Sequence, residues 1–348
     1  MRRTKQIITA MALTGLFTAC KKDNDPIIVV PASTGSTLQL NGIAGNEAGS
    51  SALNTVYVDL STDKQTAVAR NSWDLGFYGG SDYRVIINNT TSATAKVLAK
   101  NDLTQVGAAD TVGLNKLALG FEVSAFNLVD NVLGSLTQTV IPATAVSDAD
   151  NKVIIINPGT GGSVAAKDWY KIRVLRSATG YKLQYAKLAA TTFSTVDIAK
   201  DADYNFKYVS LESGASVNAE PAKALWDFKW SYILYETALS PTEQIPYAFS
   251  DLIMINTQGG VQAAEVLTSA VSYDSYSTAN LSTTTFTNAV DAIGPKWRST
   301  QPATGAKTDR FYVVKDPSGN AYKIKFLAMG AGDGGTRGKP QFEYKLVK

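Results

Sequence analysis

Hydrophobic and polar residues alternate over many short stretches of this chain, and glycine, proline, asparagine and aspartate separate these stretches. Alternation with a period of two, in segments rich in β-branched and aromatic residues, is typical of half-buried antiparallel strands. Residues 322–326 (YKIKF) place their apolar side chains on one face and both lysines on the other. The preceding DPSGN (residues 316–320) has the Pro-then-Gly chemistry of a tight turn. Residues 310–326 are therefore predicted to form a β-hairpin.

Helical periodicity is scarce along the chain. Residues 264–270 and 286–293 are the best candidates for short helices, and the Thr- and Ser-rich stretch 272–288 is predicted to be an irregular loop. The predicted fold class is mainly β, either all-β or α+β, with few short helices.

The hydrophobic segments occur twice in the same order. The corresponding segments are YVDL (57–60) and YVSL (208–211), WDLGF (73–77) and WDFKW (226–230), VIIN (85–88) and IMIN (253–256), and the predicted hairpins 169–185 and 311–326. Trp73 and Trp226, the expected core residue of each copy, lie 153 residues apart (226 minus 73). Such a repeat predicts a duplicated fold of two tandem antiparallel β-rich units, residues 38–200 and 201–348. The alternative is that the hairpins of any all-β chain look alike.

The N-terminus resembles a bacterial lipoprotein signal. Basic residues at positions 2, 3 and 5 precede the apolar run 7–17, and Thr18-Ala19 stands directly before Cys20, the single cysteine of the sequence. The run is shorter than the roughly 20 apolar residues that a membrane-spanning helix needs. We predict a signal peptide over residues 1–19 and lipidation of Cys20. The alternative is an ordinary signal peptide with an incidental cysteine, but acylation explains why a secreted chain carries one thiol.

Residues 20–37 are predicted to form a polar tether. Its first part, KKDNDP (21–26), resembles the charged tracts that follow the cysteine in lipoproteins of the outer leaflet. We therefore expect the protein in the outer membrane, lipid-anchored and exposed at the cell surface, with the lipid as its contact with the membrane.

Net charge and composition favour binding over catalysis. The formal charge of +3 comes from 33 Lys and Arg against 30 Asp and Glu, and removing three basic signal residues leaves 30 against 30. A nucleic-acid partner is therefore not expected. The chain has no histidine, which excludes Ser-His-Asp and Cys-His sites and imidazole-bound zinc or haem. We find no carboxylate pair whose spacing indicates hydrolysis, and predict that the protein is not an enzyme.

The lipoprotein N-terminus, the Trp-Asp strand followed by YRV (83–85), and the C-terminal hairpin with its closing strand resemble the HmuY family of haem-binding outer-membrane lipoproteins. The resemblance covers nearly everything after residue 50, and the second copy is the closer match. It implies a β-rich unit that takes haem from host haem proteins for a TonB-dependent transporter. Known members hold the haem iron with histidines or methionines, whereas this chain has no histidine.

Haem iron also accepts Tyr or Met as an axial ligand. The candidates that the resemblance leaves are Tyr273, Tyr276, Met329 and Met254. Met254 lies in an apolar strand and equally suits a core position, and Met329 precedes a glycine-rich stretch. The two tyrosines lie in a polar loop, and a tyrosinate ligand needs a nearby cation or the ferric iron itself to ionise it.

Two functions remain open from the sequence. The first is a surface lipoprotein that binds haem or a related porphyrin without histidine ligands, through apolar walls and stacking aromatics, and passes it to a transporter. The second is a duplicated structural or adhesive module whose loops bind a glycan, a peptide or another protein and not haem. The missing histidines favour the second, and an apolar cleft with Tyr or Met side chains favours the first.

Overall fold

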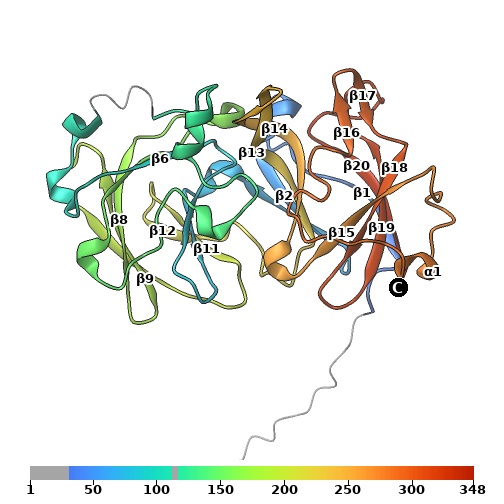
Figure 1. Ribbon diagram of the computed structural model, residues 1–348, viewed down its shortest axis with the longest axis horizontal. Coiled ribbons are helices and arrows are strands. Elements are labelled where there is room, and N and C mark those ends of the chain that lie inside the picture. The colour runs from blue at the N-terminus through green and yellow to red at the C-terminus, as the bar shows by residue number, and fades with distance from the viewer. Residues whose placement is uncertain (1–30, 112–116) are drawn as a thin grey trace, which may run out of the picture. The chain divides into compact units, whose positions relative to one another are not determined.

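Antiparallel sheets make up most of the structure, a computed structural model that describes residues 31–111 and 117–348 (Figure 1). The predicted signal peptide and Cys20 lie outside the described residues. One five-stranded sheet has the order β1 (Gly35–Gln39), β20 (Gln341–Leu346), β19 (Ala321–Ala328), β18 (Arg310–Lys315), β15 (Gln262–Leu267). The other has the order β10 (Ser194–Ala199), β9 (Gly180–Lys187), β8 (Tyr170–Arg176), β7 (Ile154–Asn157), β6 (Thr94–Val97).

Two further sheets have four strands each. The first has the order β12 (Ala215–Val217), β11 (Phe206–Ser210), β4 (Leu75–Tyr78), β5 (Val85–Ile87). The second has the order β14 (Glu243–Ile255), β13 (Phe228–Ser240), β2 (Asn54–Asp59), β3 (Lys64–Ala69). A two-stranded ribbon joins β16 (Arg298–Thr300) to β17 (Ala303–Ala306).

The helices of the described residues are short. They are α1 (Thr278–Leu281) and the 3₁₀ turns η1 (Gly49–Ser51), η2 (Arg70–Ser72), η3 (Leu103–Gln105), η4 (Ala108–Thr111), η5 (Val123–Leu128), η6 (Leu136–Gln138), η7 (Asp148–Asp150), η8 (Gly161–Ser163) and η9 (Thr257–Gly259). The mainly β fold class is therefore confirmed, and the predicted hairpin 310–326 is the pair β18 and β19.

The two predicted helices are wrong. Residues 264–267 belong to strand β15, which pairs with β18 along its whole length, and Thr287 forms an isolated bridge with Ala263 in place of a helical turn. A sheet edge supplied by a distant segment outweighs the weak helical preference of this alanine-containing stretch. The one α-helix within residues 31–111 and 117–348, α1, lies instead inside the stretch 272–288 that was predicted to be irregular.

Each five-stranded sheet shares a hydrophobic core with one four-stranded sheet. Val58 of β2 and Phe228 of β13 lie in one core with Tyr322 and Phe342 of the C-terminal sheet. The second core joins the apolar faces of β4, β5 and β11 to those of β7, β8 and β9. Apolar and polar residues alternate along the strands because one face of each sheet packs into such a core.

The two halves of the repeat exchange hairpins. The hairpin β2–β3 pairs with β13, and the hairpin β11–β12 pairs with β4, so that each completes a sheet of the other half of the sequence. In Figure 1 the blue strand β2 accordingly lies beside the yellow strand β13. Residues 32–348 form one compact unit. The two tandem units, with their boundary at residue 200, stay a prediction.

Equivalent residues of the repeat hold the exchanged hairpins. Leu60 N donates to Asp227 Oδ2 at 2.8 Å, and Leu211 N donates to Asp74 Oδ2 at 2.7 Å. Each Asp belongs to a Trp-Asp segment and each Leu ends a YVxL segment. The same hydrogen bond therefore occurs twice, once from a hairpin of the first half to the second half and once from a hairpin of the second half to the first. The sequence motif therefore joins one half of the chain to the other.

The tryptophans of these segments pack on the tyrosines of the exchanged hairpins. The rings of Trp73 and Tyr208 are 4.7 Å apart in an edge-to-face arrangement, and those of Tyr57 and Trp226 are 5.0 Å apart. Trp73 and Trp226 are 7% and 6% exposed, so their predicted position in the interior is confirmed. Edge-to-face pairs contribute about 0.5–1.5 kcal/mol beyond the area they bury.

Candidate functional site

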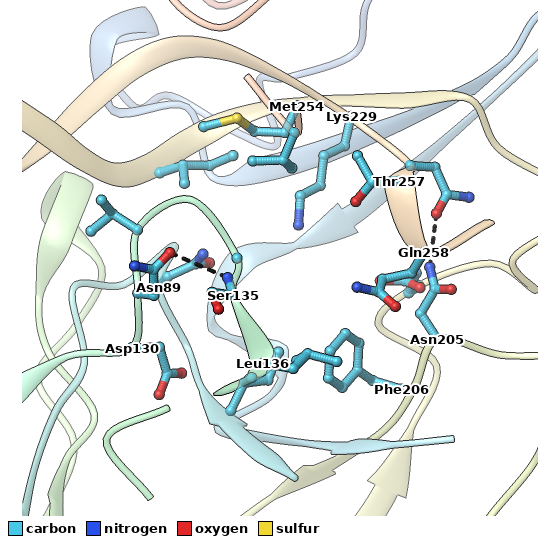
Figure 2. Close-up of a pocket in the computed structure, with 18 of the residues that line it drawn as sticks. Asn89, Asp130, Ser135, Leu136, Asn205, Phe206, Lys229, Met254, Thr257 and Gln258 are labelled. Carbon is cyan, nitrogen blue, oxygen red and sulfur yellow. Dashed lines mark hydrogen bonds between the residues drawn. The ribbon is translucent and has the colours of Figure 1, made fainter. Parts of the chain in front are cut away.

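A pocket lies where equivalent segments of the two halves meet (Figure 2). One side is formed by Trp73 and the end of the VIIN segment, and the other by Trp226 and the end of the IMIN segment. Its cavity volume is about 130 Å³, and the pocket opens to solvent beyond this cavity. Because both halves contribute to the lining, the pocket depends on the hairpin exchange.

The walls of the pocket are mainly apolar and aromatic. Phe206 and Tyr208 of β11 line it together with Trp73, and the rings of Phe206 and Tyr208 are 6.0 Å apart. The aliphatic lining consists of Ile86, Ile87, Val132, Leu136, Ile233, Ile255 and Val290. Such a surface suits the flat apolar body of an organic ligand.

A carboxylic acid and an amine lie among these apolar walls. Tyr208 donates a hydrogen bond to Glu220 Oε2 at 2.8 Å. Burial raises the pKa of the Glu220 carboxyl above its usual value, and Lys229 and Tyr208 partly oppose this effect. Burial also lowers the pKa of the Lys229 ammonium, with Glu220 acting in the opposite direction. The two charges attract each other, yet no ion pair within 4.0 Å joins them in the described chain.

The amino group of Lys229 extends into the pocket from β13 (Figure 2). In the part of the chain that the structure describes, no hydrogen bond reaches its Nζ. Lys229 itself is half-buried, whereas three other polar atoms of the lining are buried without a hydrogen-bond partner, namely Trp226 Nε1, Glu220 Oε1 and Asn205 Oδ1. Buried polar groups are normally paired, because an unpaired one costs about 1–3 kcal/mol. These groups lack the partners that buried polar groups normally have.

Asp130 fixes the loop on the opposite side of the pocket. Its two carboxylate oxygens accept hydrogen bonds from Ile87 N and Val140 N, each at 2.8 Å. Burial raises the pKa of this carboxyl to about 7, although both hydrogen bonds lower it. Asp130 thus connects the loop 130–140 to strand β5, and residues 131, 132 and 134–136 of that loop contribute to the lining.

Of the four predicted haem ligands, Met254 lines this pocket. Met254 is 3% exposed and packs with Ile233 and Leu252. Met329 is fully buried in the core of the C-terminal sheets. The role of either methionine as an iron ligand stays a prediction.

The two predicted tyrosines lie together in a different cluster. The rings of Tyr273 and Tyr276 pack edge-to-face on Phe311, with centroids 5.6 Å and 5.4 Å from it. They are 6% and 3% exposed. Burial raises the pKa of the Tyr273 phenol well above its usual value, which disfavours the tyrosinate that iron ligation needs. Their ligand role also stays a prediction.

Residues 31–111 and 117–348 hold no group of three His, Cys, Asp or Glu side chains arranged for a metal ion. Within the same ranges no helix is long and apolar enough to cross a membrane.

The sequence interpretation missed Lys229 and Glu220. A signal for Lys229 was present, because the segment WDFKW has a lysine where the equivalent WDLGF has Gly76. A lysine between two aromatic residues of a buried strand is unusual. For Glu220 we find no comparable pattern, since it lies outside the repeated segments.

The paired sheets define a mainly β protein with an aromatic-lined pocket. Residues 51–344 match the protein family described as "HmuY protein", and the chain belongs to this family. No curated protein matches the chain. A crystal structure of a candidate lipoprotein from Bacteroides fragilis is similar at 9% identity and a TM-score of 0.19, covering 90% of this chain and 92% of that one.

Proposed function

We propose that this protein is a lipid-anchored surface protein that captures haem or a related porphyrin in the pocket between its two halves. The observation that carries the proposal is the aromatic pocket with the unpaired ammonium of Lys229. A porphyrin combines a flat apolar ring with carboxylate side chains, and the pocket offers a partner for each part. Family membership and the lipoprotein-like N-terminus support this assignment.

The residues of the pocket fit the ring of haem better than they fit its iron. Met254 is the one predicted ligand in the lining, and a thioether is an accepted axial ligand. Any coordination of iron in this pocket by the predicted set therefore falls to Met254. Transfer of the captured porphyrin to a TonB-dependent transporter completes the proposed role.

The test is a titration of the mature chain without its predicted lipidated cysteine, residues 21–348, with hemin, followed by the Soret band and by tryptophan fluorescence. We expect a shifted Soret band and quenching of Trp73 and Trp226. Met254→Leu should change the band if the thioether reaches the iron. Met329→Leu is the matched control, since Met329 is fully buried in another core. Absence of any spectral change with the wild-type chain would refute the proposal.

A saccharide is the second candidate ligand, because amides and hydroxyls are numerous in the lining. They are Asn89, Asn131, Asn205, Asn256, Gln258, Ser135, Thr139 and Thr257. Amides next to aromatic rings offer hydrogen bonds and apolar contact to a sugar. Binding of the mature chain to a glycan array, lost on adding hemin, would show that both ligands use one site. An array without bound glycans would exclude this candidate.

A further inference from the structure

Lys229 is not required by the fold. It pairs with Tyr57 in the β13–β2 register, whereas its equivalent in the first half, Gly76, pairs with Tyr208. A Cβ atom at Gly76 would lie 2.8 Å from Ile86 Cγ1, so the first half excludes a side chain at this point. The second half keeps the same strand pairing and accommodates a lysine directed into the pocket (Figure 2).

The buried lysines of the described residues, Lys171 and Lys323, are satisfied by backbone carbonyls. Lys323 Nζ donates to the carbonyls of Tyr273, Asp274 and Tyr276, and Lys171 Nζ donates to those of Val106 and Ala190. This is how the chain accommodates a buried ammonium. Lys229 is half-buried and makes no hydrogen bond to a carbonyl in the described residues, so its ammonium is held by none of the contacts that the other two make.

The groups around Lys229 suit an acid. Trp226 also lines the pocket and has a buried indole N–H without a partner, and an ammonium and an indole N–H are both donors that a carboxylate accepts. Glu220 faces the same space, and burial raises the pKa of its carboxyl, so it holds a proton more readily than an exposed glutamate and opposes an anion less. Asp130 lines the pocket but is already bonded to two backbone amides.

We propose that Lys229 and Trp226 bind a carboxylate of the ligand, so that the pocket selects tetrapyrroles by their acidic side chains and not by their iron. This inference rests on the proposed function. Its basis is the contrast between an unpaired ammonium in the pocket and a predicted ligand set of which one thioether, that of Met254, reaches the lining. Metal-free porphyrins and other tetrapyrrole acids then belong to the same substrate class as haem.

The experiment compares three probes on the mature chain: hemin, metal-free protoporphyrin IX, and protoporphyrin IX dimethyl ester, whose carboxylates are blocked. Quenching of tryptophan fluorescence gives the Kd of each. We expect the two free acids to bind within about threefold of each other. The ester should bind roughly 10- to 100-fold more weakly, the range expected for one charge-assisted hydrogen-bonded contact.

The variant Lys229→Met should weaken the binding of protoporphyrin IX by a similar factor and leave the Kd of the ester unchanged. Lys64→Met, at an exposed position of β3, is the matched control and should change neither the Kd of protoporphyrin IX nor that of the ester. Equal binding of ester and free acid, or binding of hemin without protoporphyrin IX, would overturn the inference and leave the proposed function standing. Failure of all three probes would overturn both. Circular dichroism of each variant establishes that it has folded.

Discussion

Removing the Asp227 side chain tests whether this residue joins the exchanged hairpin β2–β3 to the second half of the chain. Asp227 Oδ2 accepts a hydrogen bond from Leu60 N at 2.8 Å, and both residues are buried. In Asp227→Ala this amide has no side-chain acceptor. A buried donor left unpaired costs about 1–3 kcal/mol, so we expect the free energy of unfolding to fall by that amount.

Asp227→Asn separates the hydrogen bond from the charge. The amide oxygen still accepts from Leu60 N, so the loss of stability at pH 5 should stay below about 1 kcal/mol. Burial raises the pKa of the Asp227 carboxyl from 3.8 to about 7. Between these values the folded state binds a proton that the unfolded state has released, and the free energy of unfolding therefore falls as pH rises. In the wild type this slope is about 1.4 kcal/mol per pH unit for one proton. Asparagine does not titrate, so Asp227→Asn should remove this pH dependence.

The assay is urea unfolding of the mature chain at several pH values between 4 and 8, followed by tryptophan fluorescence. The midpoint should shift at constant slope, because the folded and unfolded surfaces are unchanged. Asp197→Asn, an exposed position of β10, is the control and should change stability by less than about 0.5 kcal/mol. If Asp227→Ala unfolds at the wild-type midpoint, or if Asp227→Asn keeps the wild-type pH dependence, the reasoning is refuted.

Two other predictions concern the N-terminus and the β4–β11 contact. Cys20→Ser should abolish labelling of the full chain by an alkyne fatty acid in a bacterial host, and persistent labelling would contradict a lipid attached at this residue. Gly76→Ala places a Cβ 2.8 Å from Ile86 Cγ1 and should destabilise the protein by about 1–3 kcal/mol in urea unfolding. Gly107→Ala is its control, because no atom lies within 4 Å of a Cβ there. Equal stability of these two alanine variants would show that β4 does not need glycine at this position.

Local patterns predicted the strands of this protein well. The alternation in residues 322–326 and the DPSGN turn are properties of a few neighbouring residues, and the hairpin formed as expected. Residues 264–267 show where such patterns fail. Their alanine-containing sequence predicted a short helix, but pairing with β18 decided in favour of a strand.

The repeat also located Trp73 and Trp226 in the interior, because a large apolar residue at the start of a buried strand has few other places to go. Their partners were not predictable. The local sequence is compatible with a tyrosine that packs on the tryptophan of its own copy and equally with one that packs on the tryptophan of the other copy. The observed pairs are Trp73 with Tyr208 and Trp226 with Tyr57.

The sequence by itself determined the hairpin 310–326, its turn and the order of the repeat, since these depend on neighbours along the chain. The tertiary structure alone decided which half each hairpin completes, and thereby that Lys229 and Glu220 meet Trp73 in one pocket. Strand pairing joins backbone groups far apart in sequence. Backbone N–H and C=O groups are the same in every strand, so they do not specify which strand a given strand pairs with. The pocket follows from that pairing, and a linear pattern does not contain it.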